Sequence, residues 1–242
     1  MRATAVLAQA RVEALLSLRR AESLLISFLV PIGILVFFSE VDALNTTLRR
    51  PVDFLVPGVL ALAVMSTAMV SLGIATGFER RYGVLKRLGS TPLSRGGLLA
   101  AKTLDVVLIE VVQAVAIIGT GLALGWKLEQ GAGLALVWLL VGTIAFAGVG
   151  LLLAGTLRAE ANLAVANALF LVLLFLGGMA YPLARLPEFL EVIAHALPAA
   201  ALAESVRAAL RGASIPWDHA GVLLAWAVVA PALAARFFRW EE

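Results

Sequence analysis

Two carboxylates and an amide interrupt one apolar run of the sequence, and such groups could carry chemistry inside a membrane. Asp105 and Glu110 fall in the run 104–124, and Gln113 follows Glu110 by three residues on a neighbouring face of a helix. Ionisable groups inside apolar helices often mark ion or substrate pathways. We predict that Asp105 reaches the polar edge of the run or meets Lys102. Glu110 either forms an internal structural pair or lines a substrate path, and a proton relay is a further alternative.

Other chemistries find little support in the residue types. Ser66, Thr67 and Ser71 share one apolar run with no His or Lys that could activate a hydroxyl, so we expect them to bond back to helix carbonyls. His195 and His219 are far apart in the sequence, without an acid cluster at metal-ligand spacing. The chain has no Cys and no G-x-x-x-x-G-K-[ST] phosphate loop. We therefore predict no catalytic residue, no metal site and no ATP hydrolysis by this chain.

The composition indicates which elements must position these residues. The chain is 62% hydrophobic and 14% charged, far below the roughly 25% charged residues of a soluble domain. Apolar runs of about 20 residues match an α-helix that crosses a hydrocarbon layer of about 30 Å. The sequence therefore predicts a single all-α integral membrane domain over residues 1–242. Its six expected transmembrane helices cover residues 24–38, 54–76, 104–124, 134–157, 163–180 and 221–235.

A polar stretch, residues 77–103, separates the second and third predicted spans. It contains six Lys or Arg against the single acid Glu79. A Lys or Arg at the bilayer centre costs about 3 kcal/mol, so this stretch must lie in water. Placing it in the cytoplasm together with both termini puts thirteen Lys and Arg inside and six outside. The basic residues flank apolar runs, which favours topology over nucleic-acid binding as their role.

Two further segments complete the expected layout. Residues 1–23 have a helical apolar stripe with Gln9 and Glu13 on another side, which predicts an amphipathic helix on the inner membrane surface. The alternative is that they begin a long first helix. Residues 181–220 contain four prolines between short apolar patterns, which predicts an extracytoplasmic re-entrant pair of short helices. A soluble loop is the alternative.

Small residues recur at helical spacing in two of the apolar runs. Gly73 and Gly77, and Gly121 and Gly125, fit the small-x-x-x-small spacing that allows helices to approach closely. In a chain with 21 glycines such pairs also arise by chance. Contact with a second copy is therefore one of two interpretations.

Within the polar stretch, residues 79–88 can form a short amphipathic helix. Gly89 and Pro92 would stop this helix, and Ser94 is placed to cap the helix that leads into the third span. A rigid helix between two spans could transmit force from a cytoplasmic partner. The alternative is a loop that sets topology or holds anionic lipid, worth about 1 kcal/mol per Lys or Arg.

The run ERRYGVLKRLGSTPLSRGGLLAAK, which begins at Glu79, resembles the signature of the ABC type-2 transporter permease family. A looser similarity lies in GGMAYPLARLPEFLEVIAHALP, with Pro182, Pro187 and Pro198 in the expected outer hairpin. The resemblance implies that residues 79–94 form a cytoplasmic coupling helix that docks on a separate ATP-hydrolysing subunit. The implied coupling residues are Glu79, Arg80, Arg81, Gly83, Leu85, Lys86, Arg87, Leu88, Thr91, Pro92, Leu93 and Ser94.

The same resemblance implies partners and a location. Two ATP-binding subunits would carry ATP and Mg²⁺, with no cofactor in this chain, and a second permease would complete a homodimer or heterodimer among membrane lipids. The expected location is a bacterial cytoplasmic membrane, with residues 1–23 as a connecting helix. The expected function is export of a lipophilic drug, lipid or natural product along the apolar faces of the second and fifth spans.

Three alternatives to an exporter subunit stay open. A stand-alone secondary carrier would normally show internal repeats, and the sequence has no convincing repeat. A membrane enzyme would need a convergent nucleophile and base. A membrane scaffold without an ATPase partner requires no particular residues, so the sequence offers no test of this alternative.

Overall fold

The 242-residue chain is described by a computed structural model that covers residues 8–9, 11–13, 21–40, 51–89, 95–128, 131–180 and 182–239. These residues form helices and turns, with no strand among them, so the predicted all-α class is confirmed for the part described. The elements in chain order are α2 (Ala21–Glu40), α3 (Pro51–Val64), the π-helix η2 (Met65–Ser71), α4 (Leu72–Arg81), α5 (Val84–Gly89), α6 (Arg95–Ala123), α7 (Ala132–Thr156), α8 (Ala159–Leu176), the short 3₁₀ helix η3 (Leu183–Arg185), α9 (Glu188–His195), α10 (Pro198–Leu210) and α11 (Trp217–Phe237).

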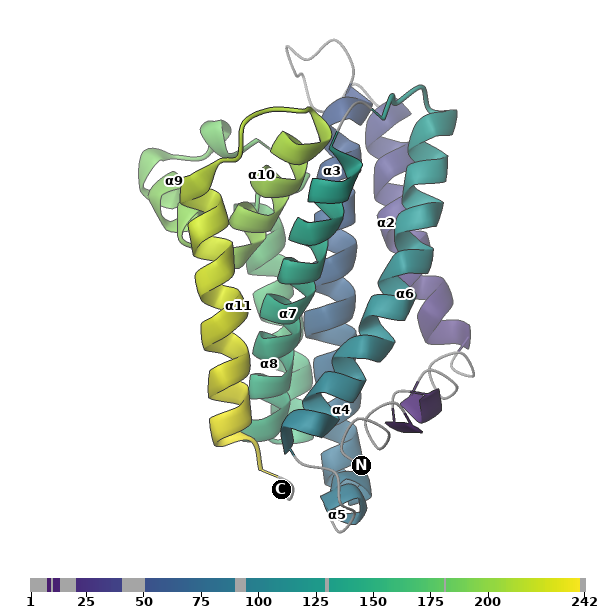
Figure 1. The fold of residues 1–242 in the computed structure, drawn as a ribbon, viewed down its shortest axis with the longest axis vertical. Coiled ribbons are helices and arrows are strands. Elements are labelled where there is room, and N and C mark those ends of the chain that lie inside the picture. The colour runs from purple at the N-terminus through teal and green to yellow at the C-terminus, as the bar shows by residue number, and fades with distance from the viewer. Residues whose placement is uncertain are drawn as a thin grey trace.

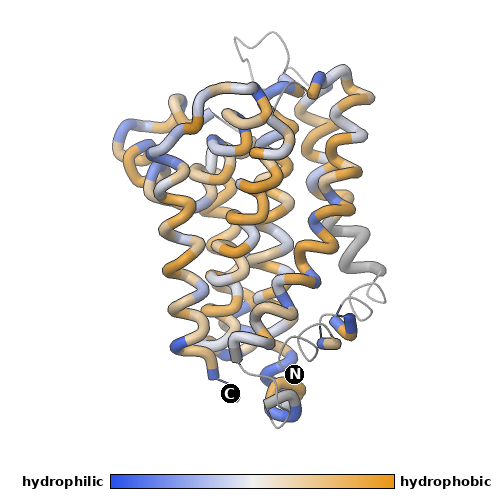
Figure 2. The backbone as a smooth tube through the Cα atoms, in the orientation of Figure 1, coloured by the Kyte–Doolittle hydropathy of each residue, from blue (hydrophilic) through white to orange (hydrophobic). Residues whose placement is uncertain are grey.

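The long helices run side by side along the long axis of the molecule (Figure 1). Hydrophobic residues dominate the middle of the bundle and hydrophilic ones gather mostly at its two ends (Figure 2). Five helices in the described part are long and apolar enough to cross a membrane, or six if the bent pair α9 and α10 counts as one span. The chain is therefore a multi-pass membrane protein.

Each predicted span coincides largely with helix, but several boundaries differ. The first, 24–38, lies in α2, whose described apolar part, Phe28–Glu40, is shorter than the other candidates. The fifth was expected to reach residue 180, yet α8 ends at Leu176. The helix stops there because Gly178 has a φ of 61°, a conformation that glycine adopts without strain.

The second span is longer than its sequence suggests. It runs unbroken through α3, η2 and α4 over 31 residues, Pro51–Arg81, where residues 54–76 were predicted. At 1.5 Å per residue this helix is about 46 Å long, against a hydrocarbon layer of about 30 Å. If the helix stands along the membrane normal, about 16 Å of it extends beyond the hydrocarbon. The start of the predicted polar stretch, residues 77–81, continues the helix.

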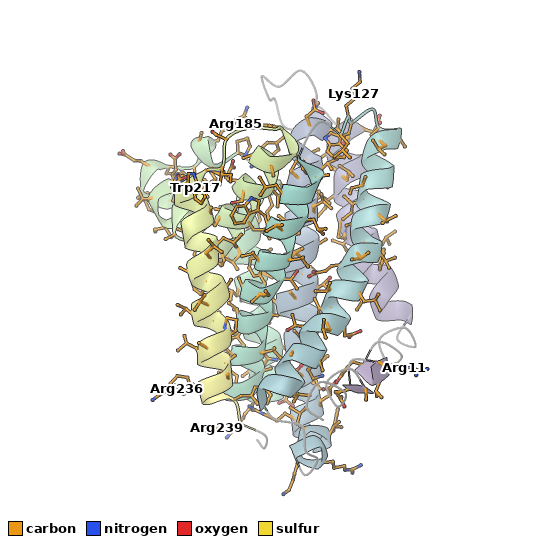
Figure 3. All side chains as sticks on the ribbon, viewed as in Figure 1. Arg11, Lys127, Arg185, Trp217, Arg236 and Arg239 are labelled. Atoms are coloured by element: carbon orange, nitrogen blue, oxygen red, sulfur yellow. The ribbon has the colours of Figure 1, made fainter. Side chains whose placement is uncertain are left out.

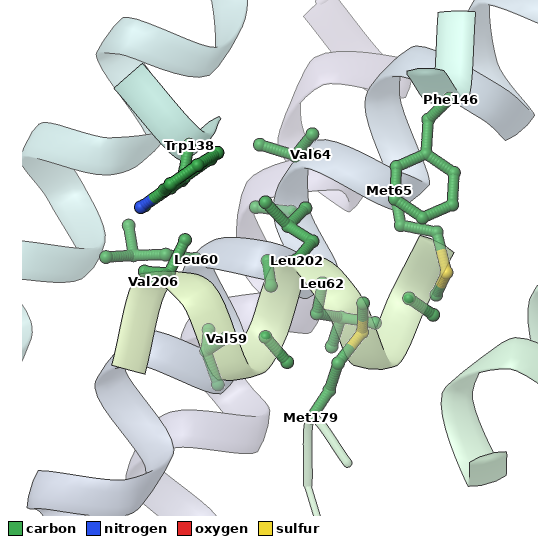
Figure 4. Packing of buried hydrophobic residues seen from close by; sticks show 14 of the residues in the cluster. Val59, Leu60, Leu62, Val64, Met65, Trp138, Phe146, Met179, Leu202 and Val206 are labelled. Atoms are coloured by element: carbon green, nitrogen blue, oxygen red, sulfur yellow. The ribbon is translucent and has the colours of Figure 1, made fainter. Parts of the chain in front are cut away.

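The same span forms the centre of the packed core. In its most apolar window 83% of the residues are buried, against 22% to 50% for the other four long helices. Its large side chains interlock with those of α7 and α10 (Figure 4). The labelled residues of this core are Val59, Leu60, Leu62, Val64, Met65, Trp138, Phe146, Met179, Leu202 and Val206.

Glycines allow this central helix to touch its neighbours through backbone. A Cβ added to Gly73 would lie 3.0 Å from the carbonyl oxygen of Gly150 in α7, and one added to Gly150 would lie 2.5 Å from that of Met69. Gly77 faces the side chain of Asn162, and Gly121 faces Val56. Gly73, Gly77 and Gly121 therefore serve contacts inside one chain, whereas nothing lies within 4 Å of a Cβ added to Gly125.

Replacing Gly150 with Ala is expected to destabilise the bundle by about 1–3 kcal/mol, the usual cost of overpacking. The reason is that the new methyl group meets backbone of η2, which cannot move aside as a flexible side chain can. Gly133→Ala in the same helix is the matched control, since nothing lies within 4 Å of its added Cβ. Thermal unfolding of both variants in detergent measures the effect, and equal midpoints would contradict the close contact.

The segment 182–220 contains the two short helices α9 and α10, bent relative to each other by 80°. The break is at Pro198, which begins α10 and lacks the N–H that would continue the helix from α9. α10 packs against α7, α3 and α11. Entry of this pair into the outer leaflet stays a prediction.

Candidate functional site

The basic stretch after the second span forms a corner between α4 and α5, which we call the α4–α5 corner (residues 79–89). α4 ends at Arg81, and α5 begins at Val84 after a two-residue turn. Gly83, in that turn, has a φ of 72°. The prediction of one helix over residues 79–88 is therefore wrong, since the chain turns in its middle. The corner occupies one extreme end of the molecule (Figure 1).

Two arginines fix the base of the corner to the bundle. The guanidinium of Arg80 is 4% exposed and donates to the carbonyl oxygen of Leu157, just past the end of α7. Arg81 forms an ion pair with Glu160 in the first turn of α8. The end of α4 is therefore attached to the connection between α7 and α8.

A buried lysine fixes the corner to two further segments. The ammonium of Lys102 in α6 lies 2.6 Å from Glu79 Oε2 and 3.1 Å from Glu13 Oε1, and the residue is 2% exposed. Removing one partner of a buried ion pair is costly because it leaves the other charge uncompensated, so each member of this contact helps to hold the others in place. The sequence placed Glu13 on the side of residues 1–23 away from the apolar stripe, and the structure shows that it is 8% exposed. Lys102 joins α4, α6 and the N-terminal segment at one point.

The outer face of the corner is exposed. Tyr82, Val84, Lys86 and Arg87 are solvent-accessible, whereas Leu85 is fully buried. Arg11, Arg236 and Arg239 lie towards the same end of the bundle, and Lys127 and Arg185 lie at the opposite end (Figure 3). The corner presents a small basic and aromatic surface that is available to a partner.

The predicted coupling residues therefore divide by environment. Glu79, Arg80 and Arg81 hold the corner in place, Gly83 makes the turn, Leu85 is buried, and Lys86 and Arg87 are exposed. The side chain of Leu88 and residues Thr91, Pro92, Leu93 and Ser94 lie outside the described part of the chain. Most of residues 1–23 also lie outside it, and residues 21–23 already belong to α2.

The intramembrane acid Glu110 has a partner that the sequence did not indicate. Its Oε2 accepts a hydrogen bond from the hydroxyl of Thr143 in α7, and the residue is 8% exposed. Its second oxygen, Oε1, is buried with no hydrogen-bond partner among the described residues. Asp105, one and a half turns earlier, is equally buried at 8% exposure. Glu110 therefore takes part in an internal pair and keeps one carboxyl oxygen for another group.

The amide of Gln113 joins α6 to the centre of the second span. Thr67 in η2 donates a hydrogen bond of 3.0 Å to Gln113 Oε1, and both side chains are buried. We expected Thr67 to bond back to its own helix, so the sequence missed this cross-helix contact. It falls within the π-helical turn, a distortion that often occurs at functional sites.

A groove lies between α3, α6 and α7 beside Glu110. Its cavity volume is about 220 Å³, and Glu110 and Thr143 are its polar lining residues. Every other described lining residue is Ala, Val, Leu or Ile. We expected a substrate path along the second and fifth spans. The groove involves the second span together with the third and fourth.

At the opposite end of the molecule, Arg207 in α10 is a buried charge that the sequence analysis missed. It is 3% exposed, donates to the carbonyl oxygen of Gly178 at 2.9 Å and pairs with Glu204. Its guanidinium stacks 4.0 Å from the ring centre of Phe54 in α3. No local signal could have linked Arg207 to Phe54, because they are far apart in the sequence.

The two histidines also meet at this end. The rings of His195 and His219 stack with their centres 5.0 Å apart, although we treated them as separate. Both line a polar pocket of about 470 Å³ with Arg207. Within the described ranges, no group of three or more His, Cys, Asp or Glu is arranged to hold a metal ion. The pair is therefore a local contact between α9 and α11.

Comparison with known proteins gives a family and a relative. The family described as "ABC-2 type transporter" matches residues 4–210. A protein of Bacillus subtilis (strain 168) named "Putative transport permease YvfS" is 25% identical over 234 residues, which cover 93% of each chain. Members of this family are membrane components of ABC transporters, are generally not catalytic, and generally work with an ATP-binding subunit. The chain belongs to the ABC-2 type transporter family.

Proposed function

We propose that this chain is the permease subunit of an ATP-driven exporter in a bacterial cytoplasmic membrane. Two copies of a separate subunit would bind ATP and Mg²⁺ and dock on the α4–α5 corner. A second permease, identical or related, would complete the path for a lipophilic substrate. The cytoplasmic side would be the end with the corner, Arg11, Arg236 and Arg239, in keeping with the excess of Lys and Arg on that side.

The observation that carries this proposal is the way the corner is attached. Its exposed residues, Lys86 and Arg87, lie on a short helix, while its base is fixed by Arg80, Arg81 and the Lys102 pairs. These contacts connect the corner to α6, α7 and α8 together. A push on the corner would therefore move several spans as a unit instead of bending one loop.

The proposed mechanism is mechanical. Closure of the two ATPases would shift the corner, and the long helix Pro51–Arg81 would transmit that shift to the middle of the membrane. There it contacts α6 through Thr67 and Gln113 and α7 through Gly73 and Gly150. Movement at these contacts would open the path to the outside.

Purification of the tagged chain from its native host in mild detergent tests this function. We expect a nucleotide-binding subunit to co-purify in equal amount, and the complex to hydrolyse ATP when Mg²⁺ is present. Mass spectrometry identifies the partner by its phosphate-loop sequence. If the chain is recovered without any nucleotide-binding subunit, a stand-alone carrier or scaffold is the correct interpretation.

A further inference from the structure

The α3–α6–α7 groove is an apolar site that contains one unsatisfied acid. Among its described lining residues, Glu110 is the single ionisable group, and the walls are aliphatic. Burying a polar group without a partner in an apolar environment is costly, so a buried free oxygen calls for a donor. Glu110 Oε1 is such an oxygen, because Thr143 satisfies Oε2 and no described residue reaches Oε1.

The groove can be entered from the side of the bundle. Three of its wall residues, Val111, Val115 and Leu136, are 49%, 68% and 52% exposed, and they lie on the outer faces of α6 and α7. In a membrane protein these faces meet hydrocarbon. A ligand dissolved in the bilayer can therefore enter the groove beside Glu110 without crossing the packed core.

Size and charge together define the ligand. A dry cavity of about 150 Å³ is enough to hold benzene, so the 220 Å³ here can hold one ring or a short alkyl body. The walls provide apolar contact but no donor. A protonated amine attached to such a body supplies three N–H donors and the charge opposite to that of a carboxylate.

We propose that the α3–α6–α7 groove binds a lipophilic amine, with its ammonium donating to Glu110 Oε1 and its hydrocarbon body against the aliphatic walls. Thr143 orients the carboxyl by holding Oε2. The assignment deepens the proposed transport function by naming a substrate class. The binding step itself needs no ATPase, so it can be tested apart from transport.

The test measures binding of 4-phenylbutylamine to the purified chain in lipid nanodiscs by titration calorimetry, with empty nanodiscs as the reference. The uncharged analogue 4-phenylbutanol is titrated in parallel. We expect the amine to bind the chain more tightly than the alcohol. Glu110→Gln should weaken amine binding about tenfold or more, the scale expected for loss of a hydrogen bond to a charged group, and leave alcohol binding within about twofold.

Two further variants separate the site from general effects. Glu191→Gln in α9 removes an acid that lies outside the groove, so it should leave amine binding unchanged. Ala114→Phe fills the groove while keeping Glu110 and should abolish binding of both ligands. Size-exclusion chromatography and circular dichroism show whether Glu110→Gln is folded. If it is not, Ala114→Phe still tests whether the ligands bind in the groove.

Several results would overturn the assignment. Equal binding of amine and alcohol would indicate a general lipid site, and unchanged amine affinity in Glu110→Gln would remove Glu110 from recognition. Absence of amine binding, with Ala114→Phe breaking a dimer, would identify the groove as a contact between two copies. None of these results bears on the co-purification of an ATPase. The proposed function is therefore tested separately, by that co-purification.

Discussion

Lys102→Met is expected to destabilise the protein by about 3 kcal/mol, at the lower end of the cost of breaking a buried ion pair. The ammonium is 2% exposed and lies between Glu79 and Glu13. Without it two carboxylates are left close together in a poorly solvated place. Their side chains are 15% and 10% exposed, so limited access to water keeps the cost from being larger. The midpoint of thermal unfolding in detergent should fall by several degrees.

The control for this prediction is Lys127→Met, which removes an exposed Lys at the opposite end of the molecule. It should change the free energy of unfolding by less than about 0.5 kcal/mol. Combining Lys102→Met with Glu79→Gln and Glu13→Gln should restore most of the loss, because no uncompensated charge is then left. Equal stability of the two single variants would show that the three-way contact contributes little.

Charge reversal at the exposed face of the corner, Lys86→Glu with Arg87→Glu, should abolish ATP-dependent transport in reconstituted vesicles. It leaves the anchoring contacts of Arg80 and Lys102 intact, and the unfolding midpoint, measured in parallel, shows whether the variant is folded. Placing like charges across an interface costs several kcal/mol, and the ATPase should therefore bind at least about 100-fold more weakly. Pull-down of the ATPase by the tagged variant measures this directly.

Lys127→Glu with Arg185→Glu is the matched control, since it reverses two exposed charges at the other end of the bundle. This variant should retain transport and ATPase binding. If the corner variant transports at the original rate, the ATPase must dock elsewhere and the proposed route of force is wrong. If both variants lose transport, the effect reflects general electrostatics and not docking at the corner.

Much of the fold follows from the sequence because a membrane-crossing helix is recognised by a run of consecutive apolar residues, which needs no knowledge of the neighbouring helices. Runs of about 20 apolar residues predict spans wherever they occur, and the cost of burying Lys86 or Arg87 in lipid predicts a polar corner after the second span. The sequence shows a glycine at positions 83 and 178, and glycine is a residue type at which helices often end. Their positive φ values, which set the real helix ends, could not be read without the neighbouring structure.

The polar contacts inside the bundle could not be predicted in the same way. Lys102 with Glu13, Thr67 with Gln113, and Glu110 with Thr143 all join different helices. Thr67, Gln113, Glu110 and Thr143 each look like an isolated polar residue in an apolar run, and Lys102 and Glu13 look like ordinary charges of two polar segments. The sequence therefore drew attention to both members of the first two pairs and to Glu110 of the third, but it could not show that they meet.

The sequence by itself determined that this chain has membrane-crossing helices, that the stretch after the second of them is too polar for the hydrocarbon, and which family it resembles. Tertiary structure decided which face of each helix is packed and which polar groups meet, including the acid in the groove and the lysine under the corner. The physical reason is that lipid tails are as apolar as a protein interior. A span therefore has similar residues on its lipid-facing and its packed sides, and no periodicity distinguishes the two.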